Sequence, residues 1–169
     1  MTCDLRTLSE LEHGVETTYR FEQDFPLSPD LERLFVRHTA EMHADTPPES
    51  IHMMPREDLV ADTIDFFVLR DQNDPIGMVA LKRLDHGQAE IKSMHVLAEH
   101  RGRGLSRLML NRLLDHARGS GVTRLYLETG AQPSFAAART LYEGAGFRYC
   151  PPFGTYVADP NSVFMTLAV

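Results

Sequence analysis

The sequence predicts an α/β protein, with the α+β character of a mixed sheet, in which helices flank a central β-sheet. The first observation is a run of three apolar, strand-like segments joined by turn-rich connections, which is typical of an antiparallel meander. The second is a strand–helix–strand order in mid-chain, which favours a parallel pair of strands. The third is a closing pair of strand-like segments. Because only one such crossover occurs, we expect a mixed sheet and not a doubly wound one.

A helix over 29–44 is the first predicted element. Ser28 stands at its N-cap and Pro29 at its first position, and both residue types favour a helix start there. Residues three and four positions apart give it a largely apolar face, formed by Leu31, Leu34, Phe35, His38 and Met42. Two consecutive prolines end this helix, and 55–60 predicts one or two further helical turns.

The predicted meander comprises the segments 66–70, 76–84 and 89–97. Turn residues at 71–75 and 85–87 connect them. A helix over 103–118 follows, and its apolar stripe contains Leu105, Leu108, Met109, Leu113, Leu114 and Ala117. Glycines at 119 and 121 end this helix. The remaining predicted elements are a strand over 124–129, a helix over 134–144, and closing strands over 147–150 and 162–167.

Composition limits the class of protein. A chain of 169 residues, 43% hydrophobic and 24% charged, fits a single globular domain over 1–169. A net charge of −7 argues against a nucleic-acid partner, which requires a basic surface. No apolar run reaches membrane-spanning length, and the acidic N-terminal segment is unlike a signal peptide, so we expect no membrane association.

Cysteine and histidine usage adds two expectations. Cys3 and Cys150 are too few for a disulfide framework, which favours the reducing cytoplasm. The eight histidines lack metal-ligand spacing. His38 and His43, five residues apart, would lie on different faces of a helix, so we assign no metal.

A turn with two glycines joins the third strand of the meander to the next helix. Gly102 and Gly104 let the backbone approach a bulky anion, and the free N–H groups of a helix start bind phosphate. Arg101, Arg103 and Arg107 add positive charge. The loop lacks the Lys-Ser/Thr pair of a P-loop and the third glycine of a dinucleotide fingerprint. It predicts a site for a pyrophosphate-bearing cofactor, the alternative being an ordinary turn with solvated arginines.

Two segments resemble motifs of the GNAT N-acetyltransferase superfamily. The run Arg-Gly-Arg-Gly-Leu-Ser at 101–106 is similar to its acyl-CoA loop, Q/R-x-x-G-x-G/A, with Ser in the last position. The run at 137–147 resembles its A-x-x-L-Y-x-x-x-G-F helix and strand entry. The resemblance covers Phe66 to the C-terminus. Four shorter segments resemble the YsnE-like branch of bacterial acetyltransferases: 47–52, 90–94, 127–130 and 159–166.

The resemblance implies the GNAT fold, with an antiparallel N-terminal meander and a parallel strand pair splayed around CoA. It implies acetyl-CoA as cosubstrate. The implied cofactor-binding residues are the loop Arg101, Gly102, Arg103, Gly104, Leu105, Ser106 and Arg107, the backbone at Met94, His95 and Val96, and Thr129 and Gly130 after the next strand. Phe135 stands where many members place an Asn that contacts the pantetheine arm, so we expect it to pack against the cofactor instead.

Two residues resemble catalytic groups of the superfamily. Tyr142 corresponds to the general acid that protonates the departing thiolate, the alternative being a core aromatic residue. Glu90 corresponds to the base used by some members, the alternative being a rim carboxylate paired with Lys92 or Arg83. His95 is a weaker base candidate, because its odd offset from Glu90 places it on the other face of a regular strand.

The acceptor side is predicted in two segments, 47–54 and 153–162, which wall the acceptor in the superfamily. The candidate residues are Glu49, His52, Tyr156 and Asp159, the alternative being that these segments only end a helix and turn into a strand. The resemblance implies direct acetyl transfer, in a ternary complex, to the primary amine of a small molecule. A protein or peptide N-acetyltransferase and a non-catalytic acyl-CoA-binding sensor are the alternatives. Dimers are common in the superfamily, so a homodimer fits the resemblance.

Overall fold

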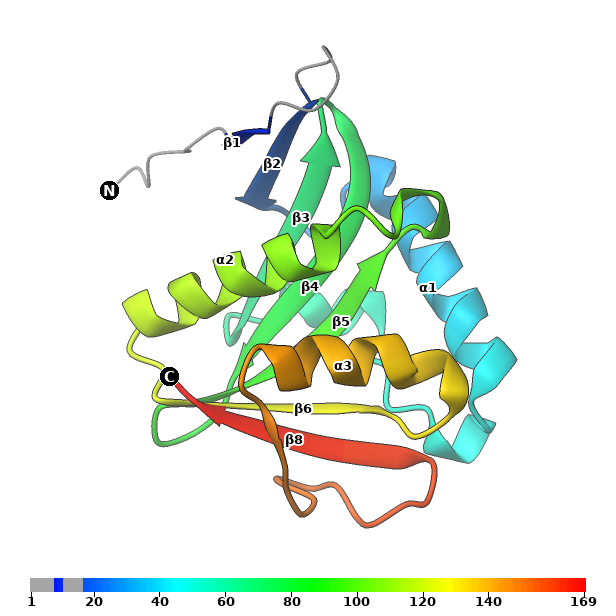
Figure 1. Ribbon diagram of the computed structural model, residues 1–169, viewed down its shortest axis with the longest axis vertical. Coiled ribbons are helices and arrows are strands. Elements are labelled where there is room, and N and C mark those ends of the chain that lie inside the picture. The colour runs from blue at the N-terminus through cyan, green and yellow to red at the C-terminus, as the bar shows by residue number, and fades with distance from the viewer. Residues whose placement is uncertain (1–7, 11–16) are drawn as a thin grey trace.

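The structure is a computed structural model that describes residues 8–10 and 17–169 (Figure 1). Eight strands form one sheet in the order β1-β2-β3-β4-β5-β6-β8-β7. Their bounds are β1 Leu8–Glu10, β2 Thr17–Gln23, β3 Ile64–Asp71, β4 Asp74–Arg83, β5 Gln88–Val96, β6 Arg124–Gly130, β7 Arg148–Tyr149 and β8 Ser162–Ala168. Only β5 and β6 pair in parallel among these strands, which confirms the mixed sheet. Cys3 lies outside the described residues.

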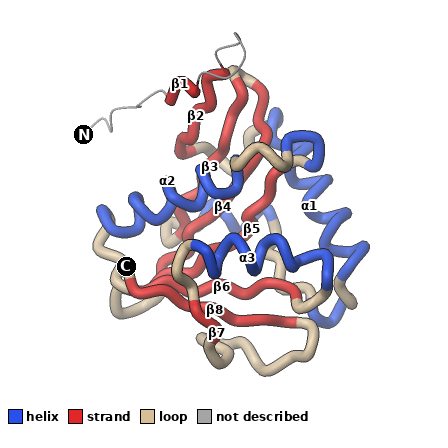
Figure 2. Tube along the Cα trace, in the orientation of Figure 1, coloured by secondary structure: helices blue, strands red, loops and turns tan. Residues whose placement is uncertain are grey.

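Three α-helices cover the two faces of the sheet (Figures 1 and 2). They are α1 Glu32–Asp45, α2 Leu105–Gly119 and α3 Ala136–Gly144. A 3₁₀ turn precedes α1 at Pro29–Leu31, and another precedes α3 at Pro133–Phe135. Helices α2 and α3 lie on one face and α1 on the other. All three helices lie where the sequence predicts them, within a few residues.

Each face of the sheet has its own apolar cluster. Every second residue of a strand points to the same face, so β3 and β4 supply Phe67, Leu69, Val79 and Leu81 to the α2/α3 side and Phe66, Val68, Met78 and Ala80 to the α1 side. The predicted stripe of α2 is buried on the first side, with Leu110 more deeply buried than Leu108. Burying side chains of this size stabilises the fold by about 1.5–3 kcal/mol each.

Strand β2 is not predicted by the sequence analysis, which assigns no element before Pro29. It pairs antiparallel with β3, and Phe21 stacks on Phe67 with ring centroids 5.1 Å apart. Tyr19 packs against the same cluster. The apolar positions of this short strand are only two, so its alternation is a weak signal.

A buried arginine links this strand to the rest of the sheet. The Arg70 side chain on β3 is only 11% exposed. Its guanidinium lies 3.1 Å from Glu22, 2.5 Å from Asp24 and 2.7 Å from Asp30. One fixed planar cation therefore joins β2, β3 and the turn before α1.

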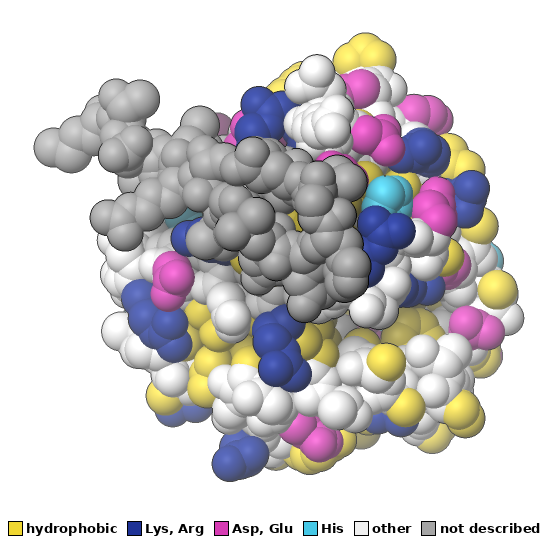
Figure 3. All heavy atoms as spheres, turned by 45° about the horizontal axis from the view of Figure 1, so that its top comes forward, with side chains coloured by type: hydrophobic (Ala, Val, Ile, Leu, Met, Phe, Trp, Pro, Cys, Tyr) yellow, Lys and Arg dark blue, Asp and Glu magenta, His cyan; other side chains and the backbone are white. Residues whose placement is uncertain are grey.

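The described surface carries charges of both signs. On the face shown in Figure 3, Lys and Arg side chains are interspersed with Asp and Glu side chains. Among the described helices, none is both long and apolar enough to cross a membrane.

Candidate active site

The central feature of the site is an opening between the two parallel strands. β5 and β6 pair only over four positions, from Gln88 with Arg124 to Ile91 with Leu127, although both strands continue further. A cavity of about 120 Å³ lies at the opening. It is lined by His38, Met42, His52, Met53, Glu90, Ile91, Lys92, Ser93, Met94, Glu128, Thr129, Gly130, Phe135, Ala138 and Tyr142. Residues from both faces of the sheet therefore meet in one space.

A β-bulge shapes this end of β5. Ser93 has φ +55°, and the register with β4 shifts between Met78 and Ala80, so β5 carries one extra residue there. Because of this extra residue, Lys92 opposes Ala80 and His95 opposes Met78, and both lie on the α1 side. The prediction that His95 lies on the other face from Glu90 is therefore wrong, because it assumed an unbroken alternation.

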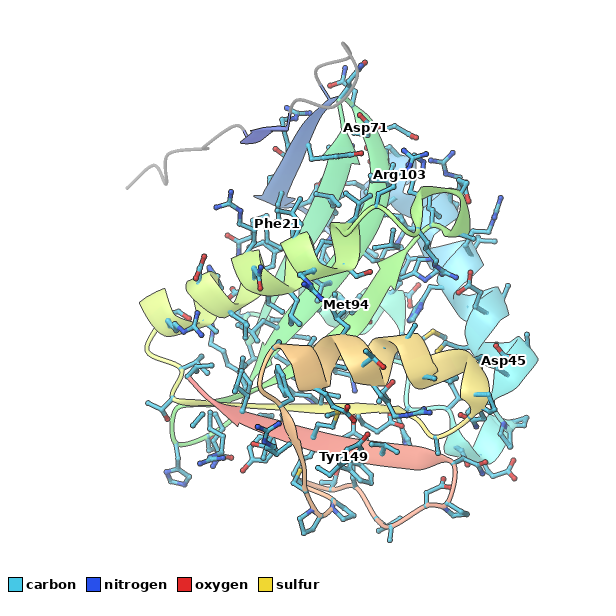
Figure 4. The ribbon with its side chains drawn as sticks, in the orientation of Figure 1. Phe21, Asp45, Asp71, Met94, Arg103 and Tyr149 are labelled. Carbon is cyan, nitrogen blue, oxygen red and sulfur yellow. The ribbon has the colours of Figure 1, made fainter. Side chains whose placement is uncertain are left out.

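The two-glycine loop follows β5 and the 3₁₀ turn Ala98–His100, and it leads into α2. Gly102 and Gly104 have φ +76° and +75°, a conformation that favours glycine, and an added Cβ at either would meet nothing within 4 Å. Arg103 and Arg107 are exposed and form no ion pair with any described residue. Figure 4 labels Arg103 near the start of α2. The loop is open and positively charged, as the sequence predicts.

Arg101 differs from its two neighbours. Its Nε donates to the Val96 carbonyl at 2.9 Å, and its Nη2 pairs with Glu41 of α1 at 2.7 Å. The side chain thus fastens the loop to β5 and to α1. The Arg101 backbone is part of the loop, but the charge of its guanidinium is already balanced by the Glu41 carboxylate.

Tyr142 reaches the opening from α3. The residue is 7% exposed, and its hydroxyl donates to the Met94 sulfur at 3.5 Å. Burial raises the pKa of Tyr142, and the charge of Glu128 adds to the shift. The phenol is therefore protonated throughout the neutral range. Met94, labelled between α2 and α3 in Figure 4, brings β5 to the same point.

A buried polar cluster occupies the α1 side of the opening. Glu90 Oε1 accepts from the Tyr156 hydroxyl at 2.5 Å and from Lys92 Nζ at 3.2 Å. Lys92 also donates to the Tyr156 hydroxyl at 2.8 Å and to the His52 carbonyl at 3.3 Å. The His52 ring packs edge-on against Tyr156. Glu90 is thus paired with Lys92, which is one of the two partners that the sequence analysis offers for a rim carboxylate. The other, Arg83, pairs with Asp65 instead.

The two predicted acceptor segments do meet in space. Asn161 Nδ2 donates to Ser50 Oγ at 3.2 Å and joins them. His52 lines the cavity and Tyr156 contacts it through Glu90, whereas Glu49 is exposed and lies outside the cavity lining. Asp159 accepts from the Asn161 backbone, and the Ser50 hydroxyl lowers its pKa. Asp159 therefore stabilises the junction and does not line the opening.

Glu128 is a cavity residue that the sequence analysis missed. It follows Leu127, the last β6 residue that pairs with β5. Burial raises the pKa of Glu128, and the charge of Glu90 acts in the same direction. The polar residues at 124, 126 and 128 alternate along β6, but only the register with β5 shows which of them reach the opening.

Phe135 and Gly130 pack against each other at the far end of the opening. A Cβ added at Gly130 would overlap the Phe135 ring and would lie 2.5 Å from Gln132 Oε1. Arg139 donates to the Gly130 carbonyl at 2.6 Å and holds this turn. Phe135 lines the cavity. Its apolar ring therefore stands where many members of the superfamily place an Asn side chain.

His95 is buried on α1 rather than open to the cavity. Its ring lies 5.1 Å from that of His38, and its Nε2 has no hydrogen-bond partner. Burial lowers the pKa of each imidazole to about 4. Both rings are therefore neutral at pH 7.

A wider hollow of about 710 Å³ lies toward the other end of β6. It is lined by residues of 83–88 and 150–154 together with Tyr126 and Thr166. It contains none of the predicted site residues. Within the described part of the chain, no three His, Cys, Asp or Glu side chains gather closely enough to hold a metal ion.

An opened parallel pair, a glycine loop before a helix and a buried tyrosine beside the opening define an acyl-CoA-dependent transferase. Residues 28–147 match the Acetyltransferase (GNAT) family. The chain belongs to this family, and it is an acyltransferase. The GNAT fold uses acetyl-CoA, which agrees with the position of the two-glycine loop.

Named relatives refine the placement. The N-acetyltransferase YsnE of Bacillus subtilis is 44% identical over 133 residues, covering 79% of this chain and 88% of the relative. A protein of Azospirillum brasilense named IAA acetyltransferase is 37% identical, covering 70% and 77%. Among solved structures, a Bacillus subtilis acetyltransferase in complex with CoA superposes with a TM-score of 0.66 at 15% identity, covering 89% of this chain and 99% of that one. The last similarity shows the fold alone.

Proposed function

We propose that this protein transfers the acetyl group of acetyl-CoA directly to the primary amine of a small molecule, while both substrates are bound. The observation that carries the proposal is the opening between β5 and β6. The opening lies at the end of β5 that leads to the two-glycine loop. Tyr142, which is buried and protonated, lies on the other side of the opening. A thioester that enters there meets an acid from one face of the sheet and carboxylates from the other.

The cofactor is proposed to enter along the exposed strand edges. The first N–H groups of α2, at Leu105, Ser106 and Arg107, have no intrahelical partner and would bind a phosphate placed at the helix start. Arg103 and Arg107 add charge. The β6-facing edge of β5 at 94–96 offers backbone groups to the pantetheine amides, with Thr129, Gly130 and the Phe135 ring opposite.

The proposed chemistry balances in four proton transfers. A carboxylate takes one proton from the acceptor ammonium, and the neutral nitrogen attacks the thioester carbon. The C–N bond forms and the C–S bond breaks as Tyr142 gives its proton to the sulfur. The nitrogen gives up its second proton, which restores the phenol, and the carboxylic acid releases its proton to water. The products are the acetamide, CoA and one proton.

The acceptor side supports a small cationic acceptor. Two carboxylates, Glu90 and Glu128, face one ammonium, Lys92, so the cluster carries a net negative charge. The cavity of about 120 Å³ suits a small amine better than a folded chain. His52 and Tyr156 supply aromatic surface beside the carboxylates.

Cys150 is a free thiol, which agrees with a cytoplasmic location.

Ligand-induced stabilisation tests the cofactor. Acetyl-CoA at a hundredfold excess over its Kd is expected to add about 2.7 kcal/mol, or a rise in Tm of roughly 5–10 °C. ATP and NAD are expected to give much smaller shifts. Gly104→Val places a branched side chain at φ +75° and is expected to abolish the shift while the protein still unfolds cooperatively. An equal shift with ATP would indicate generic nucleotide binding.

Release of the CoA thiol tests the reaction. Acetyl-CoA is combined with 2-phenylethylamine, tyramine, cadaverine and glycinamide, and with IAA because one relative carries that name. Enzyme-dependent thiol release, with the acetylated product identified by mass spectrometry, is expected with at least one of the amines. Binding of acetyl-CoA without any transfer would favour the non-catalytic sensor. Size-exclusion chromatography with light scattering tests the predicted homodimer.

A further inference from the structure

Two carboxylates lie on the α1 side of the opening, and they differ in how they are held. Glu90 has a side chain only 5% exposed, and its Oε1 receives both the Tyr156 hydroxyl and Lys92 Nζ. Glu128 forms no ion pair with any residue that the structure describes. Oε1 of Glu90 is therefore already occupied by two donors, which holds this carboxylate in place within the cluster.

The two carboxylates also differ in their position along the strands. Both line the cavity that contains Tyr142 and Met94, but Glu90 lies within the paired segment of β5 and β6, whereas Glu128 is the first residue of β6 beyond it. Tyr142 lies close enough for the Glu128 charge to raise the pKa of its phenol. An amine between the two groups would have a protonated acid on one side and a carboxylate on the other.

Resting on the acetyl transfer proposed above, we propose that Glu128 takes the proton from the acceptor ammonium and that Glu90 is a positioning residue. The Glu128 carboxylate gains the proton, the amine nitrogen gains its lone pair, and the acid later loses the proton to solvent. Glu90 acts through the groups that it holds: Tyr156, which closes the acceptor side, and Lys92, which links that side to the His52 backbone.

The charged surroundings agree with this division. Burial raises the pKa of Glu128, and Glu90 adds to that shift, while the Ser162 hydroxyl, His52 and Lys92 oppose it. Tyr142 and Tyr156 are the other titratable groups near Glu128. The pKa of each phenol is raised, so both side chains stay neutral. A carboxylate with a raised pKa is a stronger base, so it suits the deprotonation of an ammonium near neutral pH.

Two isosteric variants separate the roles. With 2-phenylethylamine, which is an ammonium at neutral pH, Glu128→Gln is expected to lower kcat/KM by about a hundredfold or more. Glu90→Gln is expected to act mainly on the acceptor KM. Hydroxylamine is uncharged at neutral pH and needs no prior deprotonation. With it, Glu128→Gln is expected to lose less than about tenfold after subtraction of the uncatalysed reaction.

The pH profile gives a second readout. The wild type and Glu90→Gln are expected to share an acidic limb in kcat/KM, set by deprotonation of Glu128. In Glu128→Gln that limb is lost, and the rate follows the free amine concentration upward with pH. An acidic limb that survives in Glu128→Gln and vanishes in Glu90→Gln would overturn the proposal and assign the base to Glu90.

A measurement without any acceptor keeps the proposal falsifiable on its own. In protein labelled with ¹³C at the glutamate carboxyl carbons, the resonance absent from Glu128→Gln is expected to titrate above the ordinary range for glutamate, with CoA bound. An ordinary pKa there would overturn the proposed role of Glu128 even if the protein acetylates amines. A raised pKa together with no transfer to any amine would leave Glu128 as a poised base and refute the proposed acceptor class instead.

Discussion

Replacement of Gly130 tests whether the end of the opening is as closely packed as the structure shows. No positive φ is found at Gly130, so its backbone tolerates an alanine and the effect of Gly130→Ala is purely steric. The new Cβ would overlap the Phe135 ring, and it would lie 2.5 Å from Gln132 Oε1 and 2.7 Å from Phe135 Cε2. Real Cβ atoms do not approach other atoms within 3.0 Å, so Phe135 must move.

The expected cost follows from this overlap. Overpacking of a buried site typically destabilises a protein by about 1–3 kcal/mol. For a chain of this size each kcal/mol lowers Tm by about 2–4 °C, so Gly130→Ala is expected to lower Tm by roughly 2–12 °C. Because Phe135 lines the cavity, the stabilisation by acetyl-CoA is expected to shrink as well.

The assay is urea denaturation followed by circular dichroism, with three further variants: Gly119→Ala, Phe135→Ala and the double variant Gly130→Ala/Phe135→Ala. Gly119→Ala is the matched control: Gly119 ends α2, and an added Cβ meets nothing within 4 Å, so a gain of up to about 1 kcal/mol is expected. Removal of the ring in Gly130→Ala/Phe135→Ala is expected to relieve the overlap. The double variant should therefore be more stable than the sum of the single changes implies. Strict additivity, or a Gly130→Ala protein as stable as the wild type, would refute the packing argument.

Three further predictions concern the acid, the buried arginine and the histidine pair. Tyr142→Phe is expected to keep the Tm shift by acetyl-CoA and to lower kcat by about ten- to a thousandfold, and unchanged turnover in the thiol-release assay would make Tyr142 a packing residue. Arg70→Ala removes a buried guanidinium that three partly exposed carboxylates share, and it is expected to cost about 1.5–3 kcal/mol in urea denaturation, whereas a loss below about 0.5 kcal/mol would show that the cluster is well solvated. Burial lowers the pKa of His38 and His95 from 6.5 to about 4, so the unfolded chain binds more protons between these values. The free energy of unfolding should therefore fall as the pH falls from 6.5 toward 4. In a His38→Gln/His95→Gln variant this dependence should be weaker, and an unchanged slope would mean that other groups cause it.

The regular elements could be predicted because their signals are local. The apolar stripe of α2, the turn at Gln72 and Asn73 and the glycines before α2 are each encoded within a few residues, and the structure has the predicted elements there. The motif that predicts Tyr142 is local as well, because it extends over a helix and its exit, and Phe135 departs from the same pattern. Both residues line the cavity, while their roles stay predictions.

The rest could not be predicted because it depends on contacts between distant segments. The side on which His95 lies depends on a single extra residue at Ser93, which no alternation rule reveals. Glu128 is a site residue only through the register of β6 with β5. Tyr156 reaches Glu90 from 66 positions away, through a segment without regular structure. Such positions are defined by packing and not by local sequence.

The short pairing between β5 and β6 has a consequence for how the protein is made and moves. Strands β1 to β5 come from the N-terminal portion of the chain and β6 to β8 from the C-terminal portion, and four residue pairs are the sheet's whole seam between them. During synthesis the N-terminal portion can pair its strands before the C-terminal portion exists, whereas the seam closes only afterwards. Tyr142 and Glu128 both belong to the C-terminal portion, so an incomplete chain has the two-glycine loop but neither the proposed acid nor the proposed base. In the finished protein, this short seam coincides with the opening at which the proposed substrates enter and the products leave.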